Sequence, residues 1–135
     1  MIYLLDTNVW VVLLRSKSAV VDARFRVEAA AGTVRSCSVV AAELRHGAFR
    51  SAKPAENRAA VDTILAPFPS VPFDDDAAEH YAEIRHHLEQ IGQPIGPLDL
   101  QIAAIARHHG WTVVTHNLGE FSRVPGLHCE VWQSP

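Results

Sequence analysis

Ile2-Tyr3-Leu4-Leu5, followed by Asp6-Thr7-Asn8, stands at the start of the chain. Consecutive apolar residues that end at polar, turn-forming ones predict a short strand buried on both faces. Strands of that kind belong to parallel sheets that helices cover on both sides. The opening residues therefore favour an α/β fold with this strand inside the sheet.

The rest of the chain alternates between predicted strands and helices. Further strands are predicted over 34–37, 71–73, 111–115 and 130–132. Helices are predicted over 9–14, 19–31, 39–49 with Ser38 as the capping residue, 54–65, about fifteen residues from Asp74, and from Pro97 to a stop at Gly110, with a turn or short helix over 117–121. This alternation predicts an α/β fold with a central parallel sheet and helices on both faces.

Length and composition indicate one globular domain over residues 1–135. The chain has 48% hydrophobic and 20% charged residues, which argues against disorder. Twelve Lys and Arg against fifteen Asp and Glu give a net charge of −3. This charge excludes a nucleic-acid surface that is basic throughout, so any such contact needs a local patch. The candidates for that rim are Arg15, Arg45, Arg50 and Arg123, each of which is otherwise an ordinary surface arginine.

No segment of the sequence predicts a membrane span or a signal peptide. The longest unbroken aliphatic or aromatic run, residues 9–14, is far shorter than the roughly 20 residues that cross a bilayer. Cys37 and Cys129 lie far apart without metal-binding spacing, and we expect free thiols in a reducing compartment. The sequence therefore predicts a cytoplasmic protein.

Three acidic residues, Asp6, Glu43 and Asp99, lie just after predicted strands or in the helices that follow them. Taken singly, each has an ordinary explanation: a helix N-cap, a solvated helix position and a favourable position in the helix dipole, respectively. Ligands of open parallel sheets bind beyond the carboxyl ends of the strands, where these acids would meet. At about 5 Å and an effective dielectric constant of about 20, each pair of like charges costs about 3 kcal/mol. Oxygen ligands select Mg²⁺ or Mn²⁺ to offset that cost, and such ions promote phosphodiester hydrolysis.

The segment after the predicted strand 111–115 offers possible accessory groups. Thr115 and Asn117 provide neutral oxygens, and Glu120 provides a carboxylate. The alternative is a simple turn in which Asn117 is a turn former.

Four segments carry a family resemblance: residues 1–8, Ala42-Glu43-Leu44-Arg45-His46-Gly47, residues 95–103 and residues 114–121. In order and spacing they resemble the signature of the PIN domain, and most of all the VapC-type toxins of bacterial type II toxin–antitoxin modules. Residues 121–127 and Trp132 are also typical of these toxins, so the resemblance spans nearly the whole chain.

The resemblance implies a three-layer α/β/α sandwich and a Mg²⁺- or Mn²⁺-dependent endoribonuclease that cleaves tRNA or rRNA loops. Asp6 and Asp99 would be the principal metal ligands, with Glu43 as a third ligand or the residue that orients water. Asn117 stands where the family often has a fourth acid, so Glu120 is the residue that could contribute instead.

The resemblance also implies partners. Such toxins are inhibited by a small antitoxin that wraps the toxin and can place a basic side chain in the acidic pocket. Toxin homodimers within toxin–antitoxin heterooligomers are usual, and operator DNA is contacted through the antitoxin. The resemblance implies no membrane partner.

Other functions are less well supported. A P-loop is excluded because no Gly-Lys-Ser/Thr occurs. A haloacid-dehalogenase-like phosphatase needs an Asp two residues after Asp6, where Asn8 stands, and a downstream lysine that neither lysine of the chain fits. A receiver domain needs a lysine in the C-terminal half, and none follows Lys53. A catalytically weak PIN-like binding or scaffold module is the main alternative.

Histidines and aromatic residues are expected to be structural. The eight histidines show no HxxxH or HExxH spacing, so we expect surface or structural roles and not zinc ligands. Four aromatic residues are expected in the core: Trp10, Phe25, Phe49 and Trp111.

Overall fold

A five-stranded parallel sheet forms the centre of the computed structural model, which describes residues 1–133. The strand order is β3-β2-β1-β4-β5, and every neighbouring pair is parallel. The strands are β1 (Tyr3–Leu5), β2 (Val34–Cys37), β3 (Ser70–Val71), β4 (Thr112–Val114) and β5 (His128–Glu130). The predicted parallel sheet with an internal N-terminal strand is confirmed.

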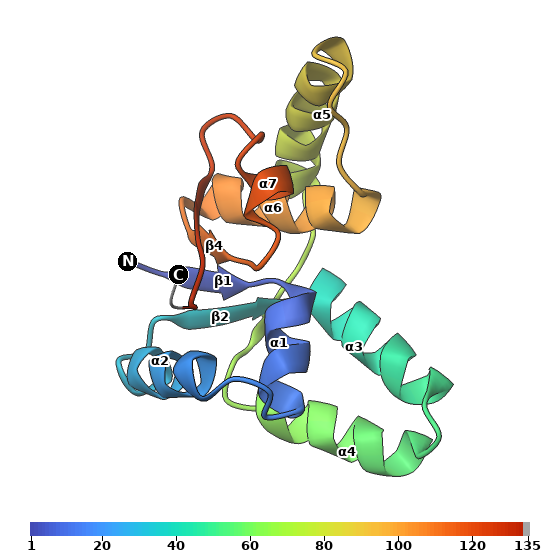
Figure 1. Ribbon diagram of the computed structural model, residues 1–135. Coiled ribbons are helices and arrows are strands. Elements are labelled where there is room, and N and C mark those ends of the chain that lie inside the picture. Colours follow the sequence, from blue (N-terminus) through green and yellow to red (C-terminus); the bar gives the residue numbers. More distant parts are fainter. Residues whose placement is uncertain (134–135) are drawn as a thin grey trace.

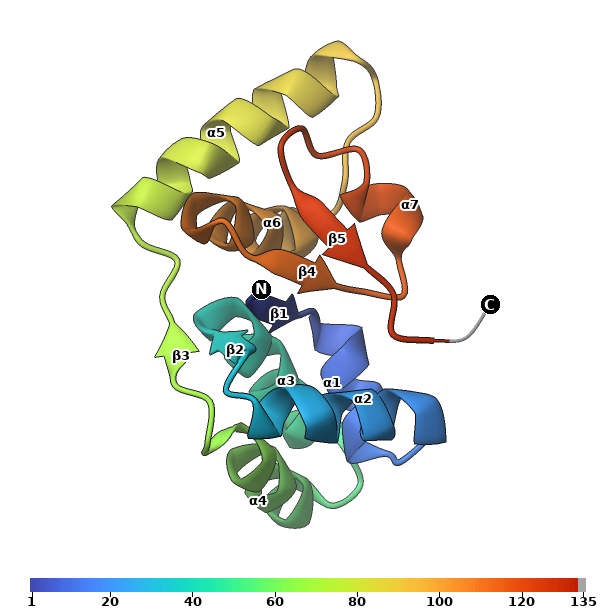
Figure 2. The same ribbon diagram turned by 90° about the vertical axis from the view of Figure 1, so that its left-hand side faces the viewer.

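Helices cover both sides of this sheet. They are α1 (Thr7–Leu14), α2 (Ala19–Ala30), α3 (Ser38–Arg50), α4 (Pro54–Leu65), α5 (Asp75–Gln90), α6 (Pro97–His109) and α7 (Leu118–Phe121). The helices α5 and α6 lie on one side, and α1, α2 and α4 lie on the other (Figures 1 and 2). This arrangement confirms the predicted α/β sandwich. Within residues 1–133, no helix combines the length and apolar character needed to cross a bilayer.

The core sits around the two central strands and α6. All three residues of β1 and all three of β4 are buried, as burial on both faces requires. The middle of α6, from Ile102 to Ala106, is buried without interruption. Gly110 ends α6 in the left-handed conformation at φ +72°, which glycine adopts without steric cost.

Three predictions about local structure are wrong. Cys37, not Ser38, is the N-cap of α3, and it makes no side-chain capping bond; the Ser38 hydroxyl instead accepts the backbone N–H of Phe73. The last strand is His128–Glu130, two residues earlier than predicted, because its partners in β4 set the register. Phe49 is 70% exposed near the end of α3, whereas Trp10 is fully buried.

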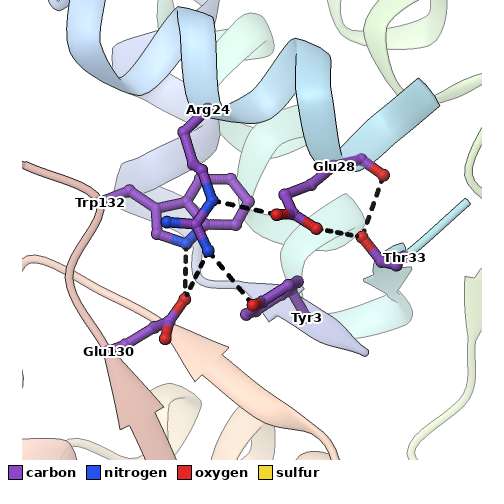
Figure 3. Close-up of polar contacts among 6 residues, drawn as sticks. All are labelled: Tyr3, Arg24, Glu28, Thr33, Glu130 and Trp132. Atoms are coloured by element: carbon purple, nitrogen blue, oxygen red, sulfur yellow. Dashed lines mark hydrogen bonds and ion pairs between the residues drawn. The ribbon is translucent and has the colours of Figure 1, made fainter. Parts of the chain in front are cut away.

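Arg24 of α2 contacts both β1 and the C-terminal segment that includes β5 (Figure 3). Its guanidinium donates to Glu28 at 3.1 Å, to the Tyr3 hydroxyl at 3.2 Å and to Glu130 at 3.3 Å. It also lies 5.2 Å from the ring centre of Trp132, whose indole N–H donates to Glu130 at 2.9 Å. One side chain therefore joins α2, β1 and the segment that follows β5.

We predict that Arg24→Ala lowers the free energy of unfolding by about 1 kcal/mol, or roughly 4 °C in Tm, because it removes ion pairs and packing against aromatic rings together. Thermal unfolding followed by circular dichroism measures this change. Arg26→Ala is the matched control, since Arg26 is an exposed arginine of the same helix, and its expected change stays within about 0.5 kcal/mol. Equal effects of the two substitutions would contradict the role of Arg24.

Candidate functional site

The topology of the sheet places a crevice where β1 and β4 end. In the sheet, β2 and β3 lie on one side of β1, and β4 and β5 lie on its other side. Ligands of such sheets bind at this switch of strand order, beyond the carboxyl ends of the strands. Asp6 follows β1 there, and its backbone N–H donates to the carbonyl of Val114 at 3.0 Å. Thr115 follows β4 at the same level, so the two side chains meet.

Asp6 is a buried carboxylate, 3% exposed, with both oxygens engaged. One oxygen accepts the N–H of Val9 at 3.0 Å and so caps α1, and the other accepts the Thr115 hydroxyl at 2.5 Å. Burial raises the pKa of Asp6 and the charge of Glu43 adds to the rise, while these hydrogen bonds and His116 act against it. The predicted capping role is therefore real, and it coexists with a position in the crevice.

Glu43 reaches the same crevice from α3. Its neighbours Val40 and Leu44 are buried and anchor this turn of the helix, while Glu43 itself is half-buried. The hydroxyl of Thr7 donates to Glu43 at 2.7 Å. Glu43 is therefore not the freely solvated helix residue that its position in the sequence alone allowed.

Asp99 lies in the first turn of α6, and Glu120 comes from α7. The pKa of Asp99 is raised to about 6, first by burial, then by a hydrogen bond with Glu120 and by the negative charges of Asp6, Glu120 and Glu43. The charges of the three other carboxylates therefore all act on Asp99. We call Asp6, Glu43, Asp99 and Glu120 the acidic cluster.

No lysine or arginine forms an ion pair with this cluster among residues 1–133. Every ion pair in that range joins other residues, and none includes a member of the acidic cluster. The charge is instead met by two neutral hydroxyls, those of Thr7 and Thr115. Partial burial without an ion-pair partner leaves the site ready for a cation or for protons.

The acidic cluster is open rather than tightly closed. In the described part of the chain, no three of its members bring ligand atoms within 4.8 Å of one another; that condition is met elsewhere, by Asp74, Asp76 and His108. Mg²⁺ usually takes one or two carboxylates and keeps several waters, so an open set of oxygens suits it better than a closed cage. The donor set of carboxylates and hydroxyls therefore fits a hard divalent ion.

A groove of about 250 Å³ lies between α1, α3 and α4, and Glu43 is the member of the acidic cluster that lines it. Thr7 and Glu43 line one part of it, and Val11, Leu14 and Leu44 give it an apolar wall. Arg15 is the predicted rim arginine that borders this groove.

The other predicted rim arginines lie elsewhere or contact other groups. Arg45 borders a different pocket, together with Ser36 and Asp62. Arg123 donates to the carbonyl of Pro94. Arg50 is exposed at the end of α3. Of the four, Arg15 is the one that lines the same groove as Glu43.

Two residues next to the predicted site were missed from the sequence. Thr7 holds Glu43 by its hydroxyl, and the signal available was its place directly after Asp6 at the end of β1. His116 acts on Asp6 through its charge, and its place directly after Thr115 was the corresponding signal. Asn117 contributes through its backbone, since its N–H donates to the Thr115 hydroxyl at 2.8 Å.

Comparison with known proteins gives concordant matches. The PIN domain family matches residues 3–127. The tRNA(fMet)-specific endonuclease VapC of Shigella flexneri is 37% identical over 130 residues, 96% of this chain and 97% of that protein. Ribonuclease VapC2 of Rickettsia felis is 36% identical over 132 residues, 98% of each chain.

Solved structures match equally well. VapBC2 from Rickettsia felis bound to a DNA fragment from its promoter has a TM-score of 0.92 and 34% identity, and the match covers 98% of this chain and 100% of that one. DNA-bound VapBC from Salmonella typhimurium has a TM-score of 0.92 and 34% identity, with 98% and 99% covered.

We predict that Asp99→Asn stabilises the metal-free protein near pH 7. The raised pKa means that Asp99 contributes stability in full below its ordinary value of 3.8, and that this contribution is lost as the pH rises through about 6. Because Asp99 is only partly buried, solvent screening reduces the expected gain to about 1 kcal/mol. Thermal unfolding in EDTA at pH 4 and pH 7 measures it.

The variant should gain stability over the wild type at pH 7 and lose that advantage at pH 4. Glu79→Gln, at an exposed carboxylate of α5, is the control and should change little at either pH. A lower Tm for Asp99→Asn at pH 7 would show that the ionised carboxylate supports the fold.

Proposed function

The chain belongs to the PIN-domain family, and on that premise we propose that it is the VapC-type toxin of a VapBC toxin–antitoxin module, a metal-dependent endoribonuclease. Relatives that are 34–37% identical over nearly the whole chain carry the names endonuclease or ribonuclease VapC. The solved VapBC complexes share its fold at a TM-score of 0.92.

One observation supports the catalytic role above the others: four carboxylates gather at the switch point, and within residues 1–133 no lysine or arginine forms an ion pair with them. The pKa of Asp99 is raised to about 6, first by burial and then by Glu120 and the negative charges of Asp6 and Glu43. Like charges about 5 Å apart cost about 3 kcal/mol per pair at an effective dielectric constant of about 20, so the arrangement favours a bound cation. A binding or scaffold module would not need carboxylates placed where they repel one another.

The proposed metal ligands are Asp6 and Asp99, with Glu43 as a third ligand or the group that orients water, and Glu120 as an accessory acid. Oxygen donors of this kind select Mg²⁺ or Mn²⁺. Such an ion activates water and stabilises the charge on the leaving oxygen of a phosphodiester.

The protein's own part is to hold these carboxylates in place. Thr115 and the N–H of Val9 fix both oxygens of Asp6, and Thr7 fixes one oxygen of Glu43. Groups that orient the ligands of a metal usually matter for affinity and activity. Thr7 and Thr115 are therefore proposed as positioning residues.

The proposed substrate is RNA, and initiator tRNA is the first to test, because relatives at 37% and 36% identity are named tRNA(fMet)-specific. Arg15 borders the groove beside Glu43 and can contact the RNA backbone without reading its sequence. Ribosomal RNA loops are the second class of target.

The proposed partner is an antitoxin that covers the acidic cluster. The groove between α1, α3 and α4 has an apolar wall and the carboxylate of Glu43, which suits a segment with apolar residues and one basic side chain. We propose a toxin homodimer within the toxin–antitoxin complex, with operator DNA contacted through the antitoxin, in a cytoplasmic setting.

We predict that the purified protein cleaves initiator tRNA with Mg²⁺ or Mn²⁺, and that EDTA abolishes cleavage. Asp6→Asn and Asp99→Asn should each lower the rate at least 100-fold, because each removes a proposed metal ligand. Gel separation of labelled tRNA, with mapping of the cleaved ends, measures the rates.

Glu79→Gln is the control for a lost carboxylate and should keep wild-type activity. Circular dichroism should show that all variants are folded. Full activity in EDTA, or unchanged activity of both Asp variants, would refute the metal-dependent mechanism. Folded protein that binds RNA without cleaving it would favour the scaffold alternative.

We predict that an antitoxin encoded directly upstream forms a stable complex with this chain and suppresses cleavage. Leu14→Asp, in the apolar wall of the groove, should weaken the complex at least tenfold, because it places a charge against an apolar segment. Binding of the two purified proteins measures the effect. Val20→Asp, at an exposed apolar residue of α2, is the control, and an equal loss in both variants would contradict docking in this groove.

A further inference from the structure

A second group of metal-ligating side chains lies where α5 begins and α6 ends. Asp74, Asp76 and His108 bring ligand atoms within 4.8 Å of one another, the one group of three or more that meets this condition among residues 1–133. We call it the α5–α6 cluster. We propose that it binds a divalent transition-metal ion of the Zn²⁺ type, at a site separate from the acidic cluster.

Asp74 is held in position before any ion arrives. It is the N-cap of α5, and one of its oxygens accepts the N–H of Ala77 at 2.9 Å. A carboxylate has two oxygens, so capping leaves one free to coordinate. Hydrogen bonds of this kind orient metal ligands and reduce the entropy lost on binding.

Asp76 and His108 face each other across the two helices. The Nε2 atom of His108 lies 3.8 Å from an oxygen of Asp76, too far for a hydrogen bond and close enough for both to reach one ion after small side-chain movements. Asp76 is exposed and His108 is partly exposed, so such movements meet little resistance.

The surroundings leave the negative charge of this cluster uncompensated by arginine. Arg107 is adjacent to His108 in sequence, but its guanidinium donates to Glu83, to His80 Nδ1 and to the carbonyl of Pro125. The sequence adds Asp75 between the two ligating aspartates. Arg107 therefore does not occupy the position between these carboxylates and His108, which leaves them open to a cation.

Two further imidazoles lie beside His108. The ring centres of His80 and His109 lie 5.4 and 4.7 Å from that of His108. A neutral imidazole offers a ring nitrogen as a metal ligand.

The donor set separates this site chemically from the acidic cluster. One imidazole nitrogen with two carboxylates suits Zn²⁺ and similar ions, whereas the acidic cluster offers only oxygens. The two sites lie near opposite ends of α6, since Asp99 and His108 are about 13 Å apart along the helix at 1.5 Å per residue. An ion at the α5–α6 cluster would link the start of α5 to the end of α6.

The expected absence of zinc ligands among the histidines is revised by this proposal. That expectation rested on spacing within a single helix. Here the ligands come from α5 and α6, so no short motif records them.

The test is a titration of ZnCl₂ into full-length protein carrying Asp99→Asn, in excess MgCl₂, followed by calorimetry. The Asp99→Asn background removes one proposed ligand of the acidic cluster, and Mg²⁺ competes for the remaining oxygens. Loss of Zn²⁺ binding in variants of the α5–α6 cluster therefore tests this site separately from the nuclease proposal. We expect one Zn²⁺ per chain and a higher Tm. His108→Ala and, separately, Asp76→Asn should each weaken Zn²⁺ binding at least tenfold.

His86→Ala is the matched control, because His86 is an exposed histidine of α5 outside the cluster, and it should bind Zn²⁺ as tightly as the parent. Asp76→Asn changes an exposed side chain and so remains folded, which keeps the test decisive if His108→Ala is unstable. Zn²⁺ should also shift the imidazole NMR signals of His108 and leave those of His86 in place. The absence of saturable binding, or equal affinity in the parent, His108→Ala and Asp76→Asn, would overturn the proposal.

Discussion

Repulsion among the four carboxylates of the acidic cluster is the constraint on which the site depends. Parallel pairing of β1 with β4 sets Asp6 and Thr115 side by side, and α3, α6 and α7 carry the other acids to the same crevice. The elements that carry the four acids cannot move apart without disturbing the buried core. The repulsion must therefore be offset by groups within the site. The hydroxyls of Thr7 and Thr115 stabilise two of the carboxylates, and the raised pKa values of Asp6 and Asp99 favour their protonated, uncharged forms. The proposed catalytic ion would offset the remaining negative charge.

The sequence was most informative where local chemistry and burial agree. The N-terminal strand and the helix 54–65 were predicted closely, because an unbroken apolar run and a helix-starting proline each favour one structure. The three acids Asp6, Glu43 and Asp99 were found because residues after parallel strands converge at one edge of the sheet. Their roles as metal ligands remain predictions.

Features that depend on distant partners could not be predicted in the same way. The register of β5 is set by pairing with β4, and the Ser38 hydroxyl binds a residue of another segment, Phe73. Phe49 is apolar yet exposed, because its position on α3 faces away from the core. The hydroxyl of Thr7 and the imidazole of His108 acquire their partners only when separate helices meet.

The outermost strands limit how another chain can approach this sheet. At one edge β3 has two residues and lies between Pro69 and Pro72, which have no backbone N–H to donate; at the other edge β5 has three residues. An incoming strand would find too few free backbone groups to extend the sheet in either direction. Amyloid-like growth by strand addition at the sheet edges is therefore disfavoured. A protein that binds this chain is expected to do so through side-chain contacts with the helices.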